Sequence, residues 1–159
     1  MFIRIVYMKE FNETQRFSQW WLWLILLGTW GAIVYAIFQE PPKSIIAYFV
    51  TGFSAFGLPI LFWQMRLSTR ITSDGIYVRF VPFHSKEQFY AWDLIESAQV
   101  RTYSPLREYG GWGIKYGFNG QGKVYNVSGN QGLQLIFKSG EKLLIGTQKS
   151  AEIQAAVRV

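Results

Sequence analysis

Residues 20–38 read WWLWLILLGTWGAIVYAIF and contain no charged side chain. At about 1.5 Å per residue, a helix of this length nearly spans the roughly 30 Å hydrocarbon core of a bilayer. A second uncharged run follows at 44–65, SIIAYFVTGFSAFGLPILFWQM, and between the two runs Pro41 and Pro42 force a reversal. The sequence therefore predicts a transmembrane helical hairpin over residues 20–65.

Two other interpretations of these runs are less consistent with the residues. A cleaved signal peptide has an apolar stretch of about 7 to 15 residues and an A-x-A site, whereas the first run is longer, lacks that site and is followed at once by a second run. Buried helices of a soluble core would each need a polar stripe facing water, and neither run has one.

The cations flanking the runs predict the orientation of the hairpin. Arg4, Lys9 and Arg16 precede it and Arg66 and Arg70 follow it, whereas the connecting turn holds only Lys43. By the positive-inside rule, both termini are cytoplasmic in a multi-pass protein of the inner (plasma) membrane. We expect a tryptophan and arginine belt at the cytoplasmic interface, formed by Arg16, Trp20, Trp21, Trp23, Trp63, Arg66 and Arg70. Asn12 with Gln15 resembles a helix-capping pair, which predicts that the first helix begins near Glu13.

Small residues recur every four positions in both runs and predict how the two helices pack. In an antiparallel hairpin the expected contacts are Gly28 with Ala55, Ala32 with Thr51 and Ala36 with Ala47. Pro59 lacks a backbone donor and should bend the second helix near Ala55, helped by Gly57. Neither run contains an acidic side chain, a lysine or an arginine, so an ion or proton path is not indicated.

After Arg66 the pattern changes to short period-two runs separated by turn residues, which is typical of antiparallel strands. Asp74-Gly75, Asn119-Gly120 and Ser139-Gly140 mark hairpin turns, and an apolar stripe over 150–158 predicts one C-terminal helix. The predicted fold is therefore an α+β membrane protein. It has a cytoplasmic segment at 1–19, the hairpin with helices at 20–38 and 44–65, and a β domain at 66–159 built as a barrel or orthogonal sandwich. A further strand at Phe2 to Tyr7 is expected at an edge of this domain.

Several segments resemble bacterial membrane-anchored pleckstrin-homology-like (PH-like) proteins. They are the two apolar runs, the strand LSTRITSDGI at 67–76, the strand ending AWDLI at 91–95 and the C-terminal helix. The segments YSPLREYGGWGI at 103–114 and YNVSGN at 125–130 are similar to an uncharacterised branch of that family with two N-terminal membrane helices. The resemblance covers nearly the whole chain and implies a cytoplasmic PH-like barrel held at the membrane, with no assigned chemistry.

The loop from Tyr103 to Trp112 and its neighbours combine cations with aromatic rings, a mixture that suits recognition of phosphate groups or of a protein partner. An alternative is purely structural, with Pro105 setting a turn and the rings packing on the end of the barrel. The candidate surface consists of Arg101, Tyr103, Arg107, Tyr109, Trp112 and Lys115.

Composition limits the chemistry that we expect. The chain has no cysteine and one histidine, His84, so we predict no metal site, no cofactor and no catalytic residue. Residues 66–159 hold 12 Lys and Arg against 7 Asp and Glu without a nucleic-acid motif, which favours an anionic membrane surface over DNA or RNA. The first hypothesis is a non-enzymatic module that binds a protein partner or forms a homo-oligomer. The alternatives are a sensor of anionic lipid headgroups and an enzyme acting on a lipid or glycan.

Overall fold

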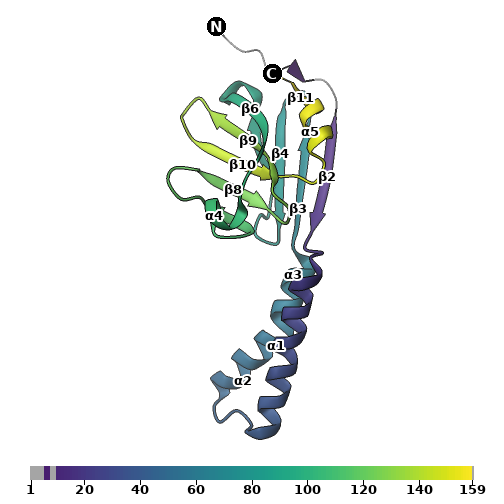
Figure 1. Ribbon diagram of the computed structural model, residues 1–159, viewed down its shortest axis with the longest axis vertical. Coiled ribbons are helices and arrows are strands. Elements are labelled where there is room, and N and C mark those ends of the chain that lie inside the picture. Colours follow the sequence, from purple (N-terminus) through teal and green to yellow (C-terminus); the bar gives the residue numbers. More distant parts are fainter. Residues whose placement is uncertain (1–5, 8–9, 159) are drawn as a thin grey trace. The chain divides into compact units, whose positions relative to one another are not determined.

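The computed structural model describes residues 6, 7 and 10–158 (Figure 1). The chain divides into two compact units. One combines the described parts of Met1–Arg16 with those of Arg66–Val159, and the other is Phe17–Met65. The first unit is therefore made from two pieces of chain, and the second unit is inserted between them.

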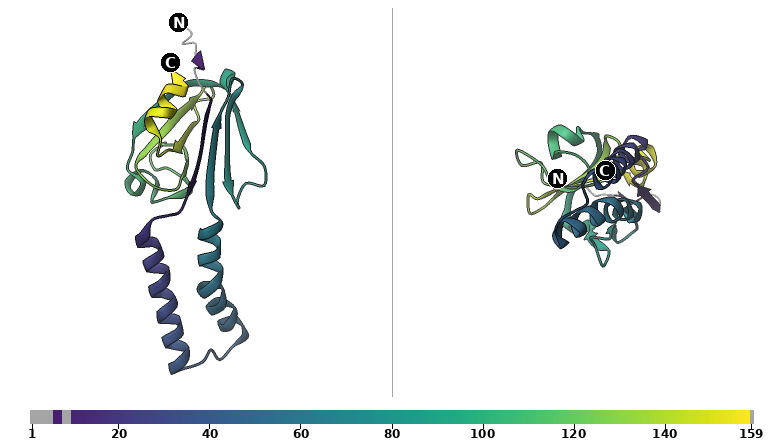
Figure 2. Two further views of the ribbon diagram at one scale, coloured as in Figure 1. Left: turned by 90° about the vertical axis from the view of Figure 1, so that its right-hand side faces the viewer. Right: turned by 90° about the horizontal axis from the view of Figure 1, so that it is seen from below.

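The inserted unit is a pair of antiparallel apolar helices (Figure 2). Helix α1 spans Trp20–Gln39, and the second helix, Ile45–Gln64, consists of α2 (Ile45–Gly52), η1 (Phe53–Gly57) and α3 (Leu58–Gln64). These limits agree with the two predicted runs. The Ser44 hydroxyl caps α2 by accepting the Ala47 N–H at 3.2 Å. Both helices are long and apolar enough to cross a membrane, and α1 has no buried residue.

The second helix is irregular at the position that Pro59 predicts. Segment η1 is a π-helical turn, in which the Leu58 N–H bonds to Phe53 O, five residues earlier. Proline has no N–H for Ala55 O, and its ring would crowd that carbonyl in a regular α-helix. The π turn is wider than an α-helical turn and covers the residues around Ala55. It therefore accommodates the hydrogen bond that Pro59 cannot donate, and the helix continues.

The predicted packing of small residues needs correction. Gly28, Ala32 and Ala36 are exposed, and a Cβ added at Gly28 would meet no atom within 4 Å. Of their predicted partners, Ala47 and Thr51 are half-buried and only Ala55 is buried. The partly covered side chains of α1 are larger ones: Leu22, Trp23, Leu26, Ile33 and Val34. Because these bulky residues share the covered side of α1, its small residues lie on the uncovered side.

The first unit contains a four-stranded antiparallel sheet with strand order β2-β3-β4-β5. Its strands are β2 (Phe11–Arg16), β3 (Arg66–Ile71), β4 (Gly75–Val81) and β5 (Gln88–Ala91). Buried and exposed residues alternate along β2 and β3, so one face of this sheet lies in the core.

A five-stranded sheet with strand order β6-β9-β10-β8-β7 completes most of this unit. Its strands are β6 (Ile95–Thr102), β7 (Gly113–Tyr116), β8 (Lys123–Asn126), β9 (Gln131–Phe137) and β10 (Lys142–Gly146). The remaining elements are η2 (Trp92–Leu94), α4 (Pro105–Tyr109), α5 (Ser150–Ala156) and the short pair β1 (Val6–Tyr7) and β11 (Val157–Arg158).

The largest error of the sequence interpretation concerns Phe11–Arg16. This segment is not the start of the first helix but strand β2, which pairs with β3 from Phe11↔Ile71 to Arg16↔Arg66. Glu13 on this strand accepts hydrogen bonds from the Thr147 hydroxyl at 2.6 Å and the Gln148 N–H at 2.9 Å. These long-range bonds outweigh the local capping pattern. The β unit therefore includes β2, and the predicted boundary at residue 66 is incomplete.

Two further expectations change in the β unit. Strands β8 and β10 pair in parallel, so the second sheet is mixed and not wholly antiparallel. Of the N-terminal strand predicted at Phe2 to Tyr7, the described part is Val6–Tyr7; it pairs with β11 in a separate two-stranded sheet and not with an edge of a larger sheet, and its first four residues lie outside the described residues. The C-terminal helix is present as α5. The fold is thus α+β, with two sheets and two apolar helices.

The second sheet is covered on both faces, and each face has a different cover. Register places Lys123, Tyr125, Leu143 and Leu135 on one face, which meets the first sheet through Tyr90. The opposite face carries Val124 and Leu144, which form a buried cluster with Tyr103 and Tyr109. The loop after β6 therefore covers this sheet from outside.

Candidate functional site

The segment from Tyr103 to Trp112 forms this outer cover. Tyr103 and Tyr109 are 4% and 2% exposed, and their rings meet edge-to-face with centroids 5.9 Å apart. The Tyr103 hydroxyl accepts a hydrogen bond from the Asn126 side chain at 3.0 Å. Two of the six candidate surface residues are thus part of the core, in agreement with the structural alternative.

Arg101 is held by partners within the β unit. Its guanidinium donates to Glu108 Oε2 at 2.7 Å, to Gln134 Oε1 at 3.0 Å and to the Tyr109 hydroxyl at 3.3 Å. The other oxygen of Glu108 accepts the Ser104 N–H at 2.7 Å. Burial alone would raise the pKa of Glu108, but the bonds from Arg101 and Ser104 outweigh it and lower that pKa. This ion pair fixes α4 to the sheet.

The remaining three candidates of the loop differ in what they contact. The Trp112 indole donates to Gly129 O at 3.3 Å, and Lys115 Nζ donates to Gly110 O at 2.8 Å. Arg107 is exposed and forms no hydrogen bond or ion pair with a described residue. The predicted cation and aromatic surface is therefore reduced to one free cation.

The predicted membrane-interface residues fall into two groups. Trp20, Trp21 and Trp63 are exposed at the N-terminal end of α1 and the C-terminal end of α3, and the Phe17 and Phe62 rings meet with centroids 5.6 Å apart. The Trp23 indole donates to Phe17 O at 3.2 Å.

The arginines of that set belong to the β unit. Arg16 and Arg66 are cross-strand neighbours at the ends of β2 and β3 where the helices join, and both are exposed. Arg70 instead bonds to Glu87 at 2.9 Å and lies over the Tyr77 ring. Its charge is already matched within the protein, which argues against the predicted interface role for Arg70.

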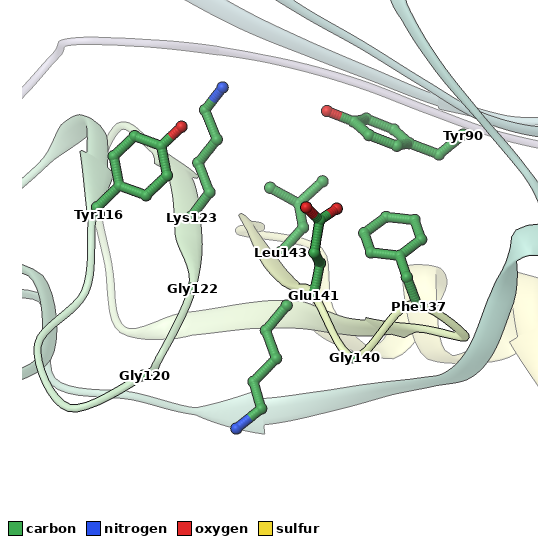
Figure 3. Close-up of a pocket in the computed structure, with 10 residues that line it drawn as sticks. Tyr90, Tyr116, Gly120, Gly122, Lys123, Phe137, Gly140, Glu141 and Leu143 are labelled. Carbon is green, nitrogen blue, oxygen red and sulfur yellow. The ribbon is translucent and has the colours of Figure 1, made fainter.

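A cavity of about 330 Å³ opens between the two sheets, at a place where the sequence interpretation proposed no site (Figure 3). Its walls come from β5, β7, β8, β9 and β10 and from the turns that join β7 to β8 and β9 to β10. Tyr116 and Lys123 lie on one side of it and Tyr90 and Phe137 on the other, with Glu141 and Leu143 between them.

Strand register explains why these side chains converge. Tyr116 pairs with Lys123, and Lys123 pairs with Leu143, so the three stand in a row on one face of the second sheet. Lys142, one residue before Leu143, is also part of the lining, although alternation along the strand turns its side chain to the opposite face. Tyr90 on β5 closes the cavity from the first sheet, and its ring lies 5.6 Å from that of Phe137.

Lys123 is the unusual residue of the cavity. It occupies the same face of β8 as the buried Tyr125, where an apolar side chain is the usual choice. Its Nζ lies 4.9 Å from the Tyr125 ring centroid and 5.8 Å from that of Tyr116, and it forms no ion pair with any described residue. Lys123 is half-buried, cation–π contacts stabilise its ammonium, and no hydrogen bond joins that ammonium to a described residue.

Two neutral polar groups adjoin Lys123. The hydroxyls of Tyr90 and Tyr125 are 3.4 Å apart, and burial together with this hydrogen bond raises the pKa of Tyr90. The Tyr90 phenol is therefore protonated at neutral pH, and one hydroxyl donor of the pair remains available because the two hydroxyls share a single hydrogen bond. The His84 ring meets Tyr125 edge-to-face at 5.1 Å, and burial followed by the charge of Lys123 lowers the pKa of His84.

Comparison of the chain with protein-family models, with curated proteins and with solved structures gives no match. Among the described residues there is no group of three or more His, Cys, Asp or Glu side chains arranged to hold a metal ion. One pattern in the sequence points to the cavity: Lys123 lies two residues before Tyr125, so both side chains face the same side of strand β8. That signal is weak because the partner strands that complete the cavity are distant along the chain.

Proposed function

We propose that this chain is a membrane-tethered PH-like interaction module and not an enzyme. In this proposal α1 and the second helix cross the inner membrane and hold the β unit at its cytoplasmic face. There the β unit binds a protein partner or assembles with copies of itself. Tethering raises the local concentration of the β unit, so weak contacts suffice for association.

The observation that carries the proposal is the uncovered apolar surface of the two helices. Each is 20 residues long, α1 contains no buried residue, and Ala55 is the one buried residue of the second helix, within the described structure. Two such helices in water would expose an apolar area far above that of an ordinary monomer surface. A bilayer covers this area without any protein partner.

The connectivity supports one side of the membrane for the whole β unit. Strand β2 precedes the helices and β3 follows them, yet the two strands pair along their full length. They can pair only when both are on the same side of a membrane crossed twice. Arg16 and Arg66 at the two junctions favour the cytoplasmic side. Their side-by-side charges repel one another unless an anionic surface lies nearby.

Single-cysteine labelling tests this topology, because the natural chain has no cysteine that would add background. Lys43→Cys probes the turn between the helices, and Ser139→Cys probes an exposed turn of the β unit. In intact cells, a membrane-impermeant maleimide should label the first variant and leave the second unlabelled until the membrane is permeabilised. The reverse pattern, or release of the chain by detergent-free lysis, would contradict the proposal.

Association is tested in native membrane particles extracted without detergent. Two differently tagged copies should co-purify, or a second protein should co-purify in a fixed stoichiometry. A truncated variant of residues 17–65, which keeps the two helices and lacks the β unit, is the control for association through the helices alone. Particles that hold a single copy and no other protein would refute the interaction role.

The alternative of headgroup sensing by the Tyr103–Trp112 loop is less well supported, because Arg101 and Lys115 already have partners and only Arg107 is free.

A further inference from the structure

We propose that the cavity between β5, β7, β8 and β10 is a binding site for a small organic monocarboxylate with an aromatic body. This is a small-molecule site and goes beyond the proposed association with a protein. The positive group is Lys123, the hydroxyl donors are Tyr90 and Tyr125, and the apolar walls are Tyr116, Phe137 and Leu143.

The charge of the ligand follows from Lys123. The Lys123 ammonium is half-buried on the core-facing side of the sheet, where a carboxylate is attracted more strongly than at an open surface. No described residue forms an ion pair with Lys123, and among the described cations without one it stands out by lying beside the aromatic cavity walls. A ligand carboxylate at Lys123 Nζ would supply the missing acceptor, and the free phenol proton of the Tyr90 and Tyr125 pair would donate to it.

The ligand carries one negative charge and not several. The lining holds two lysines, but strand alternation turns only the Lys123 side chain toward the cavity face, and Glu141 contributes a carboxylate to the same lining (Figure 3). Glu141 is exposed at the cavity mouth, and its charge disfavours a second or third negative charge on a ligand there. The lining therefore selects against polyphosphates and favours a carboxylate.

The body of the ligand follows from the walls and the size. Aromatic rings line both sides, with Tyr116 on one and Tyr90 and Phe137 on the other, and Leu143 lies between them. Offset or edge-to-face contact with such rings favours a planar aromatic group. A volume of about 330 Å³ lies at the small end of ligand pockets, which suits one or two fused rings and excludes a long acyl chain.

The probes are indole-3-acetate, its neutral analogue indole-3-acetamide, and acetate, each added to the full chain in phosphatidylcholine nanodiscs. His84 is the only histidine, so its selectively ¹³C-labelled ring gives a single NMR signal near Lys123. We expect a saturable shift with indole-3-acetate only. We also expect the pKa of His84 to rise on binding, because the bound anion offsets the charge of Lys123.

Variants assign the effect to the cavity. Lys123→Met should weaken indole-3-acetate binding by about 10- to 100-fold, the range for losing one charged hydrogen bond, and Lys123→Arg should retain most of it. Lys149→Met, at an exposed lysine outside the cavity lining, should bind like the natural chain. An unchanged thermal midpoint shows that each variant folds.

Three outcomes would overturn the proposal: equal binding of the acetamide, undiminished binding by a folded Lys123→Met variant, or no saturable shift with any probe. Ligand binding is measured on the isolated chain, whereas association is measured in native membranes. Either result can therefore be negative while the other is positive, so failure of the ligand site and failure of the proposed function are distinguishable.

Discussion

His84 accepts the Phe80 backbone N–H through Nδ1 at 3.2 Å, which requires a ring without a proton on that nitrogen. Burial, and then the nearby charge of Lys123, lower its pKa below the ordinary 6.5. In the unfolded chain the ring therefore takes up a proton at a higher pH than in the folded chain. The stabilisation is complete above about pH 6.5 and is lost as the pH falls toward the lower folded pKa.

A His84→Asn variant isolates this effect, because the Asn side-chain oxygen can accept the same N–H without titrating. Urea unfolding at pH 7.5 and pH 5.5 should show a larger loss of stability in the natural chain than in the variant. Carboxylates contribute equally to both proteins over this interval and cancel in the difference. A parallel pH dependence of the two proteins would show that His84 is not buried as a neutral ring.

Gly122 permits the parallel pairing of β8 and β10. Its φ is +78°, and a Cβ there would lie 2.2 Å from the backbone oxygen of Lys142. Gly122→Ala should destabilise the β unit by more than the roughly 1–3 kcal/mol of left-handed strain alone. Gly120→Ala is the matched control, since its φ is +74° but its Cβ would meet no atom within 4 Å. Equal losses in thermal stability for the two variants would rule out a role for the close approach.

At the scale of elements, the adjacency of β2 and β3 has a direct test. Arg16 and Arg66 are cross-strand partners, so a two-residue Asn-Gly turn can replace residues 17–65. We expect the shortened chain, with residues 10–16 joined to 66–159, to be soluble and to unfold cooperatively. Residues 66–159 alone would lack β2 and leave its buried hydrogen-bond partners at Gly146, Thr147 and Gln148 unpaired. Each unpaired buried group costs about 1–3 kcal/mol.

The comparison is made by size-exclusion chromatography and far-ultraviolet circular dichroism. The shortened chain with β2 should elute as a folded species, and the one without it should aggregate. If both fold equally well, β2 is dispensable and the predicted boundary at residue 66 is functionally adequate.

Elements with strong local signals were predictable from the sequence. The helices α1 and Ile45–Gln64 follow from uncharged length, and strands β3 to β10 follow from period-two patterns with Gly-containing turns. The segment Phe11–Arg16 was not, because the spacing of Asn12 and Gln15 fits a helix cap and the competing bonds come from residues more than 130 positions away. Parallel pairing of β8 with β10 is invisible for the same reason.

The candidate site was less predictable than the fold. A mixture of cations and rings at 101–115 indicates a surface, yet burial of Tyr103 and Tyr109 and the Arg101–Glu108 ion pair assign it to the packing of the domain. The cavity at Lys123 depends on four strands of one sheet and a facing strand of the other, an arrangement that no local pattern specifies. The chemistry of each side chain can be read from the local sequence. Which side chains converge on a cavity depends on the register between strands, which the local sequence does not specify.

At the scale of the whole molecule, the insertion of residues 17–65 between two paired strands controls the order of assembly. When the ribosome has made β2, its partner β3 is still about 50 residues from synthesis, a delay of about 3 to 10 s at 5–20 residues per second. Throughout that interval Phe11 and the edge of β2 have no sheet to join. A chaperone that binds nascent strands would therefore meet β2 before the first sheet of this protein forms. A delay in the entry of the helices into lipid would act during the same interval.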